Sequence, residues 1–230
     1  MINSSRNWLV WALLIVLVVA LAFYFGLTTG QSTSTTSAAA TSTQSTTTAA
    51  STLSTTTSAQ TTTYTNPSAG YSITYPTAFA VTTSNSPAPS TDWRVNNVAQ
   101  APGIKTFTLT VPSSFEPQTN FVGATLTVGY SQSNLALADC LIAKNGEATS
   151  TTQSINNATF AVFTMRNPGA GQLYDTTSYR TTHAGACYAV EYTIHSAQLG
   201  NYPQSSGMQQ FDETRVSALL AAIVGTFKFQ

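Results

Sequence analysis

The sequence predicts an α+β fold in which an antiparallel β-sheet is flanked by helices, preceded by one transmembrane helix and a disordered stalk. Three observations predict this order. A run of twenty apolar residues lies near the N-terminus, a Ser/Thr-rich tract follows it, and the rest alternates apolar and polar residues. Only 7% of the 230 residues are charged, against roughly 25% in ordinary soluble domains.

The apolar run at residues 8–27 contains no charge and no amide side chain. At about 1.5 Å per residue, a helix of this length spans the roughly 30 Å hydrocarbon core of a bilayer. Trp8 and Tyr24 lie near its two ends, where amphipathic rings prefer the headgroup level. The run therefore predicts a membrane anchor.

Arg6, before the apolar run, is followed by 85 residues without a charge. The positive-inside tendency then predicts that residues 1–7 are cytoplasmic and that everything after the anchor is extracytoplasmic, at the cell membrane. A cleaved signal peptide is an alternative, because residues 20–22 (Ala-Leu-Ala) have a suitable spacing, although secretory apolar runs are usually about 7–15 residues long. A pilin-type leader is a further alternative.

Residues 28–63 form the Ser/Thr-rich tract, with 25 serines and threonines among 36 residues. Such a tract buries too little apolar surface to offset its ordering entropy, and we expect a disordered stalk. As a flexible chain it would place the next domain roughly 30–36 Å from the membrane. A passive spacer is the simple interpretation, and a glycan-bearing or wall-threading segment is the alternative.

The remaining domain, residues 64–230, is long enough to bury its own core. Apolar side chains alternate along four segments, which predict strands in hairpins: residues 71–75, 107–111, 124–130 and 188–194. The Ser/Asn/Pro-rich stretch between Val81 and Lys105 predicts a long loop that Trp93 tethers. Residues 169–171 and the glycosylation sequon at residues 157–159 are both interpreted as turns.

Two helices are predicted in this domain. The first covers residues 133–143 and carries the apolar side chains of Leu135, Leu137, Leu141 and Ile142. The second begins after the N-cap Asp212, has apolar residues at helical spacing from Val216, and ends at Gly225. Residues 226–229 then leave it as a short strand.

Five short motifs resemble the PsbP-like superfamily and the uncharacterised bacterial envelope proteins that share its fold. They are Gly-Tyr-Ser-Ile-Thr-Tyr-Pro at residues 70–76, residues 155–160, Tyr179-Arg180, residues 185–188 and Thr-Phe-Lys-Phe at residues 226–229. The resemblance implies an α/β/α sandwich built on an antiparallel sheet, an extracytoplasmic location and no enzymatic activity. One departure is Thr-Ala-Phe at residues 77–79, where many relatives place a tryptophan.

Cys140 and Cys187 are the only cysteines, and both lie in the domain expected outside the membrane. An even count in an oxidising compartment favours a disulfide between them, with buried free thiols or a catalytic thiol as alternatives. Closing a loop of about 48 residues would stabilise the domain by about 4 kcal/mol.

His183 and His195 are the only histidines. If the intervening turn joins antiparallel strands, they lie about 30 Å apart, and we predict no shared metal site. No catalytic, cofactor-binding or metal-binding residue is predicted, because no catalytic or phosphate-binding motif is present. The enzymatic alternative is one histidine acting with a nearby carboxylate, the candidates being Asp139, Asp175 and Glu191.

The function predicted from these features is a membrane-anchored extracytoplasmic binding or structural module, not an enzyme. The membrane is contacted through residues 8–27, and an uncharged polar surface suits an envelope protein or a glycan as partner. A net charge of zero without a basic block argues against nucleic acid. Tyr174, Tyr179 and Tyr202 are candidates for a ligand surface, although core packing explains most aromatic residues. The alternative function is a small envelope hydrolase.

Overall fold

The computed structural model describes residues 60–84, 88–95, 101–144 and 146–230. The predicted anchor at residues 8–27 and the stalk up to residue 59 lie outside the described residues. Among the helices that are described, none is both long enough and apolar enough to cross a membrane.

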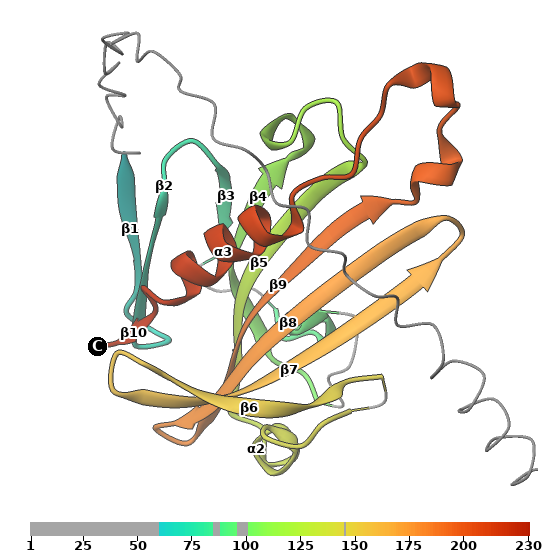
Figure 1. Cartoon of the computed structure of the whole chain (residues 1–230). Helices are drawn as coiled ribbons and strands as arrows, with labels where there is room; N and C mark the ends of the chain where they lie inside the picture. The colour runs from blue at the N-terminus through green and yellow to red at the C-terminus, as the bar shows by residue number, and fades with distance from the viewer. Residues whose placement is uncertain (1–59, 85–87, 96–100, 145) are drawn as a thin grey trace, which may run out of the picture. The chain divides into compact units, whose positions relative to one another are not determined.

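A seven-stranded antiparallel sheet forms most of the described domain (Figure 1). Its order is β3 (Ala80–Thr83), β4 (Ile104–Pro112), β5 (Phe121–Ser131), β9 (Ala186–Ala197), β8 (Gln172–His183), β7 (Ala158–Gly169) and β6 (Ala148–Ile155). Together with two α-helices, this sheet confirms the predicted α+β class.

Two-residue turns join the strands from β6 to β9. Each turn places both of its residues at positive φ, as in Asn156 (44°) and Asn157 (67°). This conformation matches the twist of the flanking strands, and asparagine and glycine adopt it at low energetic cost. The turn predicted at residues 169–171 is present at Ala170 and Gly171, whereas the one predicted at residues 157–159 lies earlier, at Asn156 and Asn157, with Ala158 and Thr159 already in β7.

A three-stranded antiparallel sheet contains β1 (Thr61–Asn66), β2 (Tyr71–Pro76) and β10 (Lys228–Phe229), with β2 at its centre. β1 begins inside the predicted stalk of residues 28–63, because Thr61 to Thr63 pair with the second half of β2. The Thr63 and Thr74 hydroxyls lie 2.8 Å apart across this pair. Threonine is β-branched and favours a strand once a partner strand is available.

The helix α3 (Glu213–Val224) confirms the second predicted helix. The Asp212 carboxylate accepts a hydrogen bond of 2.9 Å from the backbone N–H of Arg215, as expected of an N-cap. Gly225 follows as the C-cap. The strand predicted at residues 226–229 is shorter, because the Thr226 hydroxyl lies 2.7 Å from the carbonyl of Ile223 and 2.9 Å from that of Thr74.

The helix α2 (Asn134–Asp139) is shorter than the predicted residues 133–143. Residues 140–143 are not helical, and Leu135, Leu141 and Ile142 are 51%, 51% and 54% exposed. Only Ala136 and Cys140, four residues apart, are buried against the sheet. Small residues at these two positions let α2 approach the sheet closely, while the larger side chains of this segment remain exposed.

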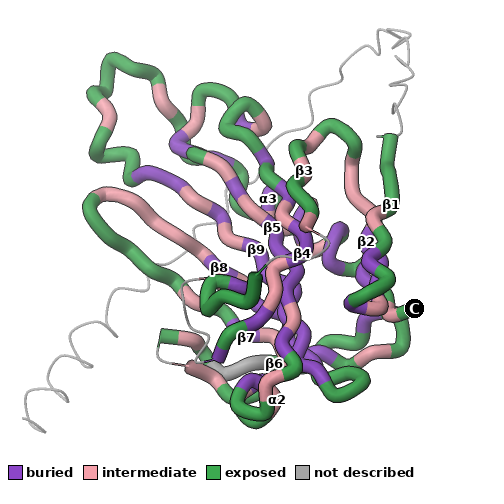
Figure 2. Tube along the Cα trace, turned by 180° about the vertical axis from the view of Figure 1, so that it is seen from behind, coloured by how far each residue is buried: buried purple, intermediate pink, exposed green. Residues whose placement is uncertain are grey.

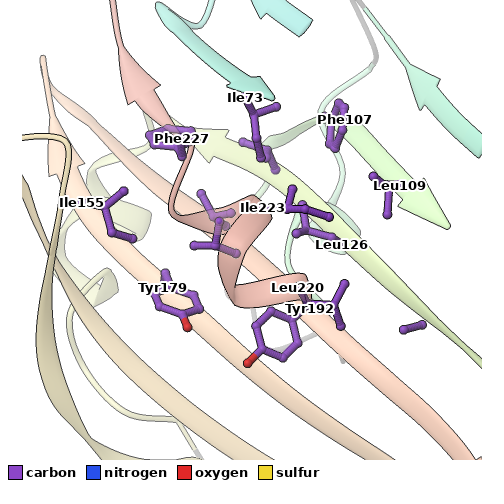
Figure 3. Packing of buried hydrophobic residues seen from close by; sticks show 14 of the residues in the cluster. Ile73, Phe107, Leu109, Leu126, Ile155, Tyr179, Tyr192, Leu220, Ile223 and Phe227 are labelled. Atoms are coloured by element: carbon purple, nitrogen blue, oxygen red, sulfur yellow. The ribbon is translucent and has the colours of Figure 1, made fainter. Parts of the chain in front are cut away.

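The inner face of the large sheet is the face that α3 and the three-stranded sheet cover (Figure 1). Figure 3 shows Leu220 and Ile223 of α3 beside Leu126 of β5 and Tyr192 of β9, with Ile73 of the small sheet nearby. These side chains belong to the main hydrophobic core. The alternating residues predicted from the sequence are the ones that fill it.

Four short 3-10 turns complete the described domain: η1 (Thr91–Trp93), η3 (Ser113–Phe115), η4 (Leu199–Asn201) and η5 (Gln204–Ser206). Figure 2 shows that exposure concentrates at the turns between strands and in the segment after β9. Near η3, the ring of Phe115 contacts Phe79 with centroids 5.8 Å apart. Phe79, in the stretch at residues 77–79, thus packs against η3.

The outer face of the sheet is partly covered by residues 91–95, here called the Trp93 segment. Trp93 is buried, and its indole N–H donates a 2.9 Å hydrogen bond to the carbonyl of Ala101. A Cβ atom at Gly129 would lie 2.4 Å from the Trp93 carbonyl oxygen, so only glycine fits below this segment. The predicted tether at Trp93 is confirmed, although residues 81–83 belong to β3.

Candidate functional site

The predicted disulfide joins Cys140, which follows α2, to Cys187 in β9. Its S–S distance is 2.08 Å and its Cα atoms are 5.6 Å apart. Both cysteines belong to a small buried cluster on the outer face with Trp93, Ala101, Ala136 and Ala189. The predicted bond is therefore confirmed, and it joins the end of α2 to the sheet.

The two histidines lie at opposite ends of the β8–β9 hairpin. His183 pairs with Ala186 beside the turn, whereas His195 pairs with Tyr174 near the other end. They also lie on opposite faces: the His183 ring stacks on Phe229 at 3.8 Å, and His195 shares the outer face with Glu191. This arrangement agrees with the predicted separation.

Each carboxylate considered as a catalytic partner has a cationic neighbour instead. Asp139 lies 2.6 Å from Lys144, Asp175 lies 3.4 Å from Arg166, and Glu191 lies 3.4 Å from Arg94. Within the described ranges, no hydrogen bond joins a histidine to a carboxylate. The hydrolase alternative thus lacks its defining pair in this part of the chain.

A buried ionic cluster of Arg94, Glu147, Arg180 and Glu191 lies on the outer face. Arg94 contacts Glu147 at 3.2 Å and Glu191 at 3.4 Å, and Arg180 contacts Glu147 at 2.7 Å. The Arg180 guanidinium also lies 3.4 Å above the Phe163 ring. Burial, together with the charge of Arg94, lowers the pKa of Arg180 to about 10.

The ionic cluster holds the Trp93 segment on the sheet. Besides its contact with Arg94, Glu191 accepts hydrogen bonds from the backbone N–H of Val95 and the hydroxyl of Ser178, both at 2.6 Å. No group of three or more His, Cys, Asp or Glu side chains in the described residues is arranged to hold a metal ion. Because its two positive and two negative side chains pair with one another, we interpret the cluster as structural, although the buried Nε of Arg180 has no hydrogen-bond partner within the part of the chain that is described.

Sequence reasoning considered Glu191 only as a possible catalytic partner and Arg180 only as part of a family motif. One available signal was the position of Glu191 between two buried apolar residues of the strand, Val190 and Tyr192, at an alternate position facing away from the inner core. A carboxylate there is either solvated or paired, and only the packing of residues 91–95 decides that it is paired.

The His195 cavity is an opening of about 280 Å³ at the other end of the outer face. All ten residues that line it are uncharged in their usual forms: Thr110, Val111, Pro112, Val122, Gly123, Ala124, Thr125, Tyr174, Thr193 and His195. Thr110 pairs with Thr125, and Thr125 pairs with Thr193, so three threonines form one row across β4, β5 and β9.

An aromatic wall bounds the His195 cavity. The Tyr174 ring stacks on His195 with centroids 4.3 Å apart and an interplanar angle of 14°. His195 Nε2 donates a 2.7 Å hydrogen bond to Gln172 Oε1, which fixes the orientation of the imidazole. Burial lowers the pKa of His195, so the neutral ring is favoured.

The three tyrosines considered for a ligand surface do not lie together. Tyr174 lines the His195 cavity on the outer face. Tyr179 is buried in the inner core, and burial raises its pKa to about 12. Tyr202 follows η4 and is half-buried. Only Tyr174 therefore remains a candidate, and the grouping is wrong for Tyr179 because that residue faces α3.

No family model matches this chain, and no curated protein matches it. Among the solved structures that are similar to this chain, two match at 10% sequence identity and a TM-score of 0.38 each. One is a crystal structure from Bacteroides thetaiotaomicron VPI-5482, matched over 73% of this chain and 48% of that chain. This chain thus spans about half of that protein.

The other is the solution structure of cyanobacterial PsbP (CyanoP) from Synechocystis sp. PCC 6803, matched over 75% of this chain and 94% of that chain. CyanoP is a PsbP protein, and the PsbP-like superfamily is the one that the sequence motifs resemble. At 10% identity the likeness concerns the fold alone.

Proposed function

We propose that this chain is a membrane-anchored extracytoplasmic binding module that recognises a neutral glycan through the His195 cavity. Residues 8–27 form the anchor, the tract that follows forms the stalk, and the folded domain is displayed outside the membrane. The observation that carries this proposal is a cavity with an aromatic wall and a row of three threonines but no charged side chain.

The chemistry of the cavity suits a sugar for two reasons. Threonine hydroxyls both donate and accept hydrogen bonds, as sugar hydroxyls do. The Tyr174–His195 pair offers an apolar ring surface with polar edges. An anionic ligand would find no cationic side chain among the lining residues.

The scaffold supports recognition without large rearrangement. The cavity residues come from the centre of the large sheet, where β5 and β9 pair along most of their lengths. A rigid site avoids the ordering entropy that a flexible loop would lose on binding. The predicted stalk would let such a site reach ligands several tens of ångströms from the bilayer.

A titration of the full chain in lipid nanodiscs tests the recognition. Neutral hexose and N-acetylhexosamine oligomers are the probes, with dextran sulfate as the anionic comparison. We expect binding of at least one neutral oligomer, and Tyr174→Ala to weaken it at least tenfold, which corresponds to about 1.4 kcal/mol.

Tyr202→Ala is the matched control, because it removes a half-buried tyrosine that does not line the cavity. Equal binding by the Tyr174 and Tyr202 variants would refute this site. Selective binding of dextran sulfate would refute the neutral-ligand proposal. Recovery of an envelope protein that contacts Tyr174 would replace the glycan with a protein partner.

The anchored topology has its own test. Protease added to intact cells should remove the folded domain, because the positive-inside tendency leaves it outside. Protection of the domain, or a mature N-terminus near Phe23, would contradict the anchor.

A further inference from the structure

The turn between β6 and β7 presents an asparagine within a glycosylation sequon. Asn157-Ala158-Thr159 has the form Asn-x-Thr, and the middle residue is not proline. Asn157 is the second residue of the two-residue turn, with φ of 67°. Asn157 and Thr159 are both exposed, so the acceptor and the hydroxyl residue of the sequon lie at the surface.

The two asparagines of this turn have different roles. The amide of Asn156 donates hydrogen bonds to the carbonyls of Gly225 at 3.1 Å and Phe227 at 2.8 Å, which fastens the turn to the end of α3. For the Asn157 amide, no hydrogen bond to any other described residue is found. Its nitrogen can therefore carry a substituent while Asn156 keeps its structural contacts.

The surroundings of Asn157 leave room for a sugar. An open cavity of about 600 Å³ lies beside the turn, within the roughly 300–1,000 Å³ typical of small-molecule sites. Asn157 and Thr159 form part of its lining, together with Leu141, His183 and Phe229. The stacked rings of His183 and Phe229 provide a flat surface for the first sugar residue.

We propose that Asn157 is an N-glycosylation site of this protein. The inference rests on the extracytoplasmic location proposed above, because glycan transfer takes place on that side of the membrane. The donor is an oligosaccharide linked through pyrophosphate to a polyprenol. Asn157 Nδ2 loses a proton to a base and bonds to the anomeric carbon of the sugar. The bond from that carbon to the donor oxygen breaks, and the polyprenyl pyrophosphate leaves with the electron pair.

Mass spectrometry of the full chain purified from membranes of its own host tests this site. Trypsin should release residues 145–166, because Lys144 and Arg166 flank them. We expect this peptide to carry the mass of one or more sugar residues, and fragmentation that retains the glycan should locate it on Asn157 rather than Asn156. An unmodified peptide would overturn the proposal.

Matched variants separate the sequon from the fold. Asn157→Asp preserves the preference for positive φ but removes the acceptor nitrogen, so the added mass should disappear. Thr159→Ala should also abolish it, whereas Thr159→Ser should retain it. A glycan that persists in Asn157→Asp would place the modification elsewhere.

Protease treatment of the same cells distinguishes failure of the glycosylation proposal from failure of the proposed topology. A domain that is cleaved from outside but carries no sugar on Asn157 would refute glycosylation and leave the topology intact. A domain that is protected inside would refute both.

Discussion

The two halves of the outer face of the large sheet differ in what the strands carry there. Below the Trp93 segment the outward positions of β5 and β9 hold Gly129, Cys187 and Ala189, all buried. Toward the other end they hold Thr125, Thr193 and His195, which are half-exposed. Small residues are required where a second segment approaches the sheet, and hydroxyl-bearing β-branched residues suit a surface in contact with water.

Glu191 lies at the border between these halves, and its substitution should change the stability of the domain more than any other. We expect Glu191→Ala to lower the free energy of unfolding by about 3–5 kcal/mol, because it leaves the buried charge of Arg94 without one of its two partners. Urea denaturation under oxidising conditions measures this change. Asp92→Asn is the control, since it removes an exposed pair with Lys105 and should change stability by less than about 1 kcal/mol.

Removal of the disulfide should destabilise the half of the outer face that lies below the Trp93 segment, here called the covered half, because the bond ties α2 to it. We expect the double variant Cys140→Ser and Cys187→Ser to be less stable by about 2–4 kcal/mol, because the unfolded chain gains entropy. Thermal unfolding with and without reductant measures it, and reductant should destabilise only the native chain. Equal stability of the native and variant chains would show that α2 needs no covalent tether.

Gly129→Ala tests the close approach of the Trp93 segment. The added methyl group would meet the Trp93 carbonyl at 2.4 Å, and we expect a loss of about 1–3 kcal/mol from overpacking. Gly169→Ala is the comparison, because no atom lies within 4 Å of its added Cβ. Similar stabilities in urea for both variants would contradict the packing described for the covered half.

Thr110→Val should weaken ligand binding without changing stability. Thr110 lines the His195 cavity, in the half of the outer face that the Trp93 segment does not cover. Thr110 is exposed, and valine keeps its shape and strand preference, so we expect stability to change by about 0.5 kcal/mol or less. Glycan binding should weaken, because one hydroxyl of the threonine row is lost. A large loss of stability would mean that the hydroxyl has a structural role instead.

The smallest expected effect is the pH dependence of His195. Burial lowers its pKa in the folded state, so folding favours the neutral ring. The stability that the neutral His195 ring contributes is fully present above about pH 6.5, the pKa of histidine in the unfolded chain. It is lost as the pH falls through the lower pKa of His195 in the folded state. His195→Gln should flatten this part of the stability profile between about pH 7 and 5. NMR titration of the ring should give a midpoint below that of the unfolded chain.

Local patterns were sufficient for the inner face. Alternation in residues 107–111 and 188–194 predicts which side chains point inward, and the 3.6-residue period from Val216 predicts the helix that covers them. The first helix, predicted at residues 133–143, was located less accurately, because the apolar side chains of a short helix have no fixed partner until the helix is placed. In the candidate site, Tyr174 and His195 were noticed separately, and their stacking was not predictable.

By itself, the sequence determined the α+β class, α3, the main hairpin turns and the Cys140–Cys187 bond, since each depends on spacing along the chain or on residue count. Only the tertiary structure decided which part of the outer face is covered. That choice depends on residues 91–95 reaching Glu191, which is distant in sequence, and on Gly129 leaving space for them. Periodicity specifies that a side chain points outward, whereas contacts between remote segments decide whether it meets protein or solvent.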